Sequence, residues 1–151
     1  MLIKQVIPQE FCLKCLDCCR FSQQESIWSP HLLEEEKQKL GEILIGANPG
    51  QDNFTCYYLK LSGNKCKIYA DRPFECQFYP FLFDRKNDRL FLALDLNCAY
   101  VSQSNLEPQF QQYTRSLIKL VQTPAYLNIL KSNPQLFQNY DGVLDLVELK
   151  V

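Results

Sequence analysis

A chain of 151 residues, 46% of them hydrophobic, is long enough to bury a core without disulfide bonds. A net charge of −1 and a pI near 5.8 provide no positive field, so we expect no nucleic-acid partner. No stretch approaches the roughly 20 apolar residues of a transmembrane helix, and the first eight residues do not resemble a secretory signal. We therefore expect a cytoplasmic protein, not inserted in a membrane, whose clustered cysteines bind metal rather than form disulfides.

The pattern of predicted elements is that of a small single α+β domain over residues 1–151. A cysteine-rich, metal-bound N-terminal run comes first, followed by two β-hairpins and by C-terminal helices that pack on them. The motif region covers residues 11–98, a helical part covers 104–132, and a tail covers 133–151.

The first helix is expected over about 30–45. Ser29 suits an N-cap, Pro30 suits the first helical position, and three glutamates follow in the first turn. The later elements expected from periodicity and turn signals are strands at 54–61 and 66–69, an irregular segment at 70–76, strands at 80–84 and 89–94, helices at about 106–122 and 124–130, and either a strand or a short helix at 143–151.

The strongest chemical signal is the run C-x-x-C-x-x-C-C, formed by Cys12, Cys15, Cys18 and Cys19. Two residues between cysteines allow a tight turn to direct both sulfurs toward one centre, as in zinc knuckles and iron–sulfur sites. Half of the eight cysteines lie within these eight residues. Metal binding is therefore the favoured interpretation, against reduced core thiols or a disulfide framework.

The remaining cysteines, Cys56, Cys66, Cys76 and Cys98, bring the total to eight, which suits two centres of four ligands each. Taken singly, each could also be a small buried apolar residue. Side chains of neighbouring residues point in different directions, so Cys18 and Cys19 are more easily placed on two nearby centres than on one. We therefore predict one or two centres, and the hypothesis of two has each centre mixing ligands from the run and from the later cysteines.

An all-thiolate donor set suits zinc or an iron–sulfur cluster and does not suit magnesium or calcium. The soft ligands and their density favour iron–sulfur, of the [4Fe–4S] type, with zinc as the alternative. A Cys₂His₂ finger is excluded because His31 is the only histidine, and a surface or capping role is expected for it.

These motifs resemble the YkgJ-like CxxCxxCC cysteine-cluster family, a zinc- or iron-chelating domain. The run at 12–19 is one element of the resemblance. The other is C-x-I-Y-x-x-R-P-x-x-C at 66–76, followed by Tyr79-Pro80. Gln77 stands where the family often has arginine, but no thiol is lost. The resemblance implies metal chelation. Its other labels, iron–sulfur oxidoreductase and a motif shared with flagellin lysine N-methylase, do not follow from the residues.

Three side chains are expected next to the metal ligands. Arg72, held extended by Pro73, is predicted to donate hydrogen bonds to cluster sulfurs or carbonyls. The alternative for Arg72 is a salt bridge to Asp71 or Glu75. Tyr69 and Tyr79 are expected either to cover the site or, as we favour, simply to pack in the core.

Three functions follow from these features. The first is a metal protein with a redox role and an unknown protein or redox partner. The second is a structural zinc module of an interaction protein. The third, a methyltransferase-related enzyme, rests on resemblance alone, since the five glycines form no G-x-G-x-x-G loop. No catalytic residue is identifiable, so whether the chain is an enzyme stays open.

Overall fold

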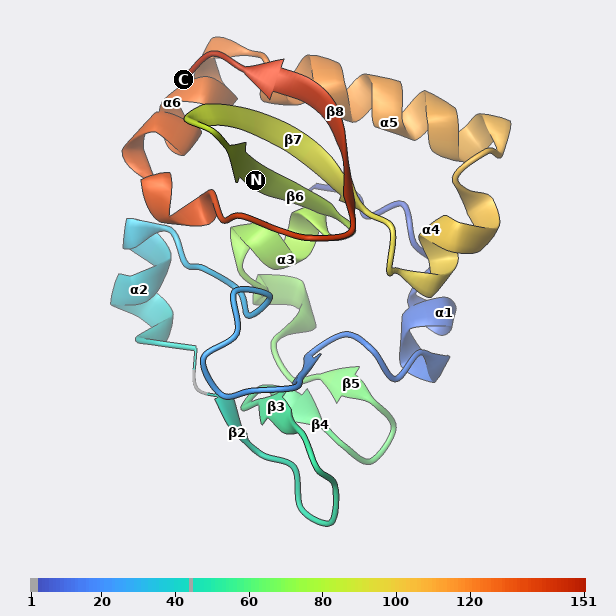
Figure 1. Cartoon of the computed structure of the whole chain (residues 1–151). Coiled ribbons are helices and arrows are strands. Elements are labelled where there is room, and N and C mark those ends of the chain that lie inside the picture. The colour runs from blue at the N-terminus through green and yellow to red at the C-terminus, as the bar shows by residue number, and fades with distance from the viewer. Residues whose placement is uncertain (1–2, 44) are drawn as a thin grey trace. The chain divides into compact units, whose positions relative to one another are not determined.

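The chain forms two units in the computed structural model, which describes residues 3–43 and 45–151 (Figure 1). One unit comprises residues 7–77 and carries seven of the eight cysteines. The other joins residues 3–6 to residues 78–151 and carries Cys98. Helices and small antiparallel sheets occur together, which confirms the predicted α+β class. Within the described ranges, no helix has the length and apolar character needed to cross a bilayer.

The unit of residues 7–77 is built from short elements. They are α1 (Gln9–Lys14), β1 (Arg20–Phe21), α2 (Glu34–Leu40), β2 (Ile45–Ala47), β3 (Phe54–Cys56), β4 (Leu59–Lys60), β5 (Lys65–Cys66), the 3₁₀ helix η1 (Tyr69–Asp71) and the start of α3 (Phe74–Phe78). The strands form two antiparallel sheets, one in the order β1-β3-β2 and one of β4 and β5. All five of these strands have only two or three residues, so their ladders contribute few hydrogen bonds.

The predicted helix over 30–45 is wrong at both ends. Ser29 is not the N-cap: its hydroxyl donates to the Ser26 carbonyl over 2.7 Å in a preceding turn. Residues 30–33 have no regular secondary structure, Leu33 is extended, and α2 begins at Glu34. It ends at Leu40 because Gly41 takes a φ of 70°, which glycine adopts without steric cost. Residues 45–47 then form β2 rather than the end of a helix; position 44 lies outside the described residues.

The first predicted hairpin is present, but its strands are differently divided. The turn at 62–64 is correct, and β4 pairs with β5 across it. The stretch 54–61 splits into β3 and β4, because β3 pairs with β1 and β2 in the other sheet. The irregular segment expected at 70–76 is formed by η1 and the first residues of α3.

The second unit contains β6 (Phe81–Lys86), β7 (Arg89–Asp95), α4 (Ala99–Ser104), α5 (Pro108–Val121), α6 (Pro124–Ser132), the 3₁₀ helix η2 (Pro134–Leu136) and β8 (Val143–Leu149). The second hairpin is confirmed, with β6 and β7 joined by Asn87 and Asp88, both at positive φ. The tail is a strand: β8 pairs with β7, so the sheet order is β6-β7-β8 (Figure 1). The helices expected at 106–122 and 124–130 correspond to α5 and α6, whereas α4 was not predicted.

The C-terminal helices pack on this sheet, as predicted. Phe81 of β6 stacks on Phe110 of α5 with ring centroids 6.0 Å apart, and it also contacts Tyr113. Phe78 lies edge-on to Tyr126 of α6. Phe81 and Leu92 are completely buried. This unit therefore has an apolar core between helices and sheet.

Candidate metal centre

The cysteine run leaves a short helix and reverses direction before β1. Cys12 lies on α1, and the helix ends where the Cys15 amide donates to the Phe11 carbonyl over 3.0 Å. Cys18 and Cys19 form a turn, with Cys19 at a φ of 61°. This left-handed conformation is uncommon for a residue with a Cβ atom. It directs the Cys19 carbonyl toward β3.

Backbone hydrogen bonds bring three cysteines from distant segments together. The Cys56 amide, at the end of β3, donates to the Cys19 carbonyl over 3.0 Å. Cys66 pairs with Leu59 in the β4–β5 ladder, and the next residue, Lys67, donates to the Tyr58 carbonyl over 2.8 Å. Because only the turn Tyr57-Tyr58 separates Cys56 from β4, the ladder places Cys66 beside it. Local strand pairing thus determines the positions of Cys19, Cys56 and Cys66.

Cys76, on α3, completes a group of four thiols that act on one another electrostatically. Burial raises the pKa of Cys76 well above its usual 9.0, and the neighbouring Cys19, Cys56 and Cys66 raise it further. Burial, then Cys56 and Cys66, raise the pKa of Cys19 to about 12. Each of the six pairs within Cys19, Cys56, Cys66 and Cys76 is coupled in this way. We call these four residues the thiol group.

The raised pKa values of Cys19, Cys56 and Cys76 keep these three thiols protonated at neutral pH when no metal is bound. Burial raises the pKa of Cys56, although the backbone N–H groups of Tyr58 and Leu59 donate toward its sulfur and lower it. Burial and the backbone N–H groups act in opposite directions on the thiolate form that binds metal. A thiolate is the species that binds, so binding releases protons, and amides directed at a sulfur stabilise the charged form.

The other cysteines have different surroundings. Cys12 acts on Cys19, and the Cys15 sulfur lies 3.6 Å from Asp17 Oδ2. Cys98 belongs to the other unit and is 6% exposed; burial raises its pKa. All eight cysteines are free of disulfide bonds. Among residues 3–43 and 45–151, no three His, Cys, Asp or Glu side chains are arranged to hold a metal ion. The assignment of eight ligands and two centres stays a prediction.

The three expected neighbouring side chains have different outcomes. The Arg72 guanidinium lies 4.1 Å from the centroid of the Tyr69 ring, and its Nη1 donates to the Tyr69 carbonyl over 3.4 Å. The alternative salt bridge to Asp71 or Glu75 is absent from the described residues. Arg72 Nε is buried and has no hydrogen-bond partner. Tyr79 lies in the unit that contains Cys98, and its hydroxyl donates to Asp95 Oδ2 over 2.9 Å.

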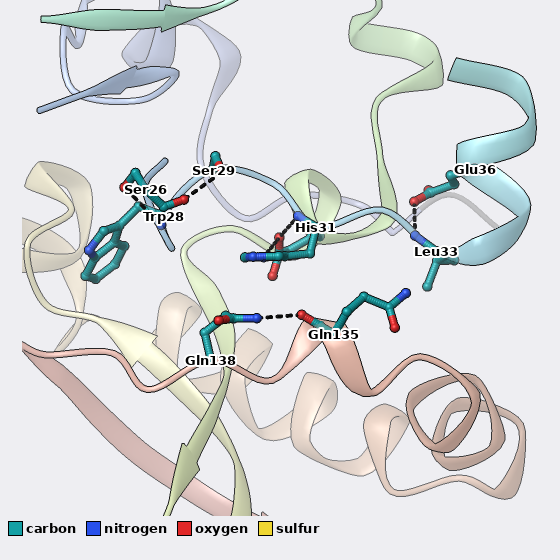
Figure 2. A network of polar contacts seen from close by, with 9 residues as sticks. Ser26, Trp28, Ser29, His31, Leu33, Glu36, Gln135 and Gln138 are labelled. Carbon is teal, nitrogen blue, oxygen red and sulfur yellow. Dashed lines mark hydrogen bonds and ion pairs between the residues drawn. The ribbon is translucent and has the colours of Figure 1, made fainter. Parts of the chain in front are cut away.

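A buried carboxylate beside Cys76 was not predicted as part of the site. Glu75 is 6% exposed, and its Oε2 accepts a hydrogen bond from the His31 backbone N–H over 2.5 Å. The His31 ring lies beside the same oxygen, with Nδ1 at 3.3 Å. His31 is therefore not a helix cap, as Figure 2 shows from its place in the segment before Leu33. Glu75 Oε1 is buried without a partner.

A second unpredicted residue, Asn64, connects the hairpin to the cysteine run. Its side-chain amide nitrogen donates to the carbonyls of Cys12, Leu13 and Cys15. Its amide oxygen accepts from Arg20 Nη1 over 2.7 Å. The sequence marked Asn64 only as a turn residue. The carbonyls that it contacts lie about 50 residues away in the sequence, and no pattern in a single sequence would have identified these contacts.

A family model for the CxxCxxCC motif matches residues 11–99, more than half of the chain, and includes all eight cysteines. The chain belongs to the CxxCxxCC family. That family is described as a "putative zinc- or iron-chelating domain", and the resemblance seen in the sequence is confirmed. No curated protein and no solved structure matches the chain. The CxxCxxCC match ends at the start of α4, so α5, α6 and β8 lie outside it.

The residues present fit the metals named for the CxxCxxCC family. The donor set is sulfur, which binds zinc and iron–sulfur clusters and not the hard cations. Arg72 Nε, four residues before Cys76, is a buried donor without an acceptor. Buried donors without partners are rare in native proteins, and a metal-bound thiolate or an inorganic sulfide is an acceptor of the required kind. Metal binding is therefore consistent with both the donors and their surroundings.

Proposed function

We propose that this protein holds a [4Fe–4S]-type cluster on the thiol group and that the cluster has a redox role. The observation that carries the proposal is the electrostatic coupling of every pair among four cysteines from four separate segments, although the described side chains are not themselves arranged to hold a metal ion. Four thiolates are the usual ligand set of such a cluster. Cys12, Cys15 and Cys18 of the same unit are left as further thiol donors. The free thiols suit the reducing cytoplasm, where we place the protein.

The surroundings of the thiol group support a redox role. N–H groups directed at cysteine sulfurs, together with burial, set the reduction potential of an iron–sulfur cluster. The amides of Tyr58 and Leu59 are directed at the Cys56 sulfur. The positive charges of Arg20 and Lys67 oppose the rise in the pKa of Cys19 and of Cys56 respectively. These groups stabilise electron-rich sulfur, which favours the reduced form of a cluster.

Zinc with a structural role is the second candidate, and a specific observation favours it. The unit of residues 7–77 has strands of only two or three residues. A metal held by four thiolates can supply folding free energy that such short elements do not. In this case the protein would present surfaces to a protein partner, and the metal would have no electron-transfer role.

Anaerobic purification with metal and sulfide analysis and an absorption spectrum tests both candidates. We expect iron with acid-labile sulfide and a visible absorption that bleaches on reduction. Colourless protein with stoichiometric zinc would select the structural candidate. Metal-free protein that is fully folded would overturn both.

A ligand variant gives a second test. C66S should abolish or sharply reduce metal content, because it removes one of four thiolates. K65S is the matched control, since Lys65 precedes Cys66 on β5 and is exposed. Equal metal content in the two variants would remove Cys66 from the centre.

A further inference from the structure

We propose that Asn64 is a positioning residue: its side-chain amide holds the cysteine run against the β4–β5 hairpin and so sets where the sulfurs of the run lie. The inference rests on the proposed metal centre. It goes beyond that centre because Asn64 carries no sulfur and is not one of the proposed ligands. It assigns a metal-site role to a residue that its sequence context marks only as part of a turn.

The contacts of Asn64 are concentrated on one short segment. Its Nδ2 lies 3.0 Å from the Cys12 carbonyl and 3.2 Å from the Leu13 carbonyl, and it also donates to the Cys15 carbonyl. The amide has two hydrogens for three acceptors, so at least one of these hydrogens is shared between two carbonyls. These carbonyls belong to the end of α1 and to the first spacing of the run. The last turn of a helix has carbonyls without intrahelical partners, and Asn64 supplies donors to them.

The opposite side of the amide is anchored through Arg20. Asn64 Oδ1 accepts from Arg20 Nη1 over 2.7 Å, and the same Nη1 lies 3.5 Å from the Cys18 carbonyl. Arg20 is itself fixed by pairing with Thr55 in the β1–β3 ladder. One amide thus connects both ends of the run to the two sheets. Cys66, two residues after Asn64, and Cys19, which precedes Arg20, are both members of the thiol group.

The backbone at Asn64 allows its side-chain role to be tested separately. Asn64 has a φ of 51° and follows Gly63 at 84°. Asparagine and glycine both adopt this region readily. If Asn64 were only a turn residue, N64G would be neutral or slightly stabilising. If Asn64 positions the run, N64G loses the side-chain hydrogen bonds to the run and to Arg20 while the backbone conformation is kept.

Aspartate provides a second variant of the same shape. N64D retains an oxygen that can accept from Arg20, but it replaces the donor with a carboxylate oxygen that faces three carbonyls. Repulsion between these oxygens should displace the run. N87G is the matched control, because Asn87 also lies in a hairpin turn at positive φ, 48°, in the other unit.

The experiment measures metal retention in the proteins as purified, by transfer of bound metal to a chromophoric chelator. We expect both Asn64 variants to hold metal about 10- to 100-fold more weakly than the natural protein, the size typical of residues that orient ligands. N87G should match the natural protein. Amide hydrogen exchange should also increase over residues 12–18 in N64G, because the clamped carbonyls and the helix end are released.

Retention and exchange equal to those of the natural protein in both N64G and N64D would overturn the positioning role while leaving the metal centre intact. A natural protein without bound metal would overturn the centre and this inference together. If N64G proves poorly folded by circular dichroism, N64D decides the question, since aspartate also tolerates the left-handed conformation.

Discussion

The carboxylate of Glu36 connects two helices of the unit that carries the thiol group. Its Oε2 accepts from the Leu33 amide over 2.9 Å at the start of α2, a contact visible in Figure 2. Its Oε1 accepts from the Phe74 amide over 2.6 Å at the start of α3. Because α3 carries Cys76, Glu36 fixes where this segment begins. The variant E36A leaves two backbone donors without acceptors.

The magnitude follows from these two contacts. Hydrogen bonds to charged groups contribute about 1.5–3 kcal/mol each, which gives about 3–6 kcal/mol for the pair. Burial raises the pKa of Glu36 more than the two amides lower it, so part of this gain is offset by the cost of burying the charge. Glu36 is also only half-buried. We therefore expect E36A to lower the free energy of unfolding by about 2 kcal/mol at pH 7.

Urea denaturation of the protein as purified measures this loss, and E35A provides the control. Glu35 is the neighbouring residue in the first turn of α2 and is exposed. It shares the interaction with the helix dipole, which contributes about 0.3–1 kcal/mol. The difference between the two variants therefore isolates the two hydrogen bonds. If E36A and E35A agree within about 0.5 kcal/mol, the connection between α2 and α3 is not a significant source of stability.

Three further predictions concern the other unit and the metal. L92A should lose about 2–5 kcal/mol in urea unfolding, because Leu92 is completely buried on the central strand β7, whereas L144A, at a site 50% exposed, should lose far less. The ion pair with Arg89 lowers the pKa of Glu148 to about 2, so the pair stabilises the fold above pH 4.5 and this stabilisation is lost as the pH falls toward 2. R89Q should raise the pKa of Glu148 toward 4.5 in an NMR titration and reduce this stabilisation. Chelation should increase amide exchange across residues 7–77 and leave β6, β7 and β8 protected, a result that uniform exchange would contradict.

Local signals predicted the second unit well. Asn87 and Asp88 mark a two-residue hairpin turn, and Thr123-Pro124 marks the beginning of α6, because each signal acts through the backbone conformation of its own residues. The β8 strand could not be distinguished from a helix in the sequence. Its pairing with β7 decides the matter, and that contact is not local.

The first unit shows where such signals fail. Ser29-Pro30 has the form of a helix start, yet α2 begins four residues after Pro30 because Glu36 reaches back to the Leu33 amide. Glu36 also reaches Phe74, which lies 38 positions away in the sequence. The cysteine spacing predicted metal binding, which the family match supports. It gave no indication of Asn64 or Glu75, because their partners come from other segments.

The two units depend on different sources of stability. Among the described residues, seven apolar side chains are buried in residues 7–77, against nineteen in residues 3–6 and 78–151. A fully buried apolar side chain contributes about 1.5–3 kcal/mol, so the first unit lacks much of the stabilisation that the second one has. A structural metal site can supply about 10–16 kcal/mol.

On the proposal that the thiol group holds a metal, a role as a store that delivers metal elsewhere conflicts with the small apolar core of residues 7–77. Release of that proposed metal would remove its stabilisation from the unit and leave buried thiols with raised pKa values. A redox role has no such conflict, because a cluster that changes only its oxidation state keeps its four ligands in place. A resident centre is thus the use of these cysteines that agrees with how the unit is held together.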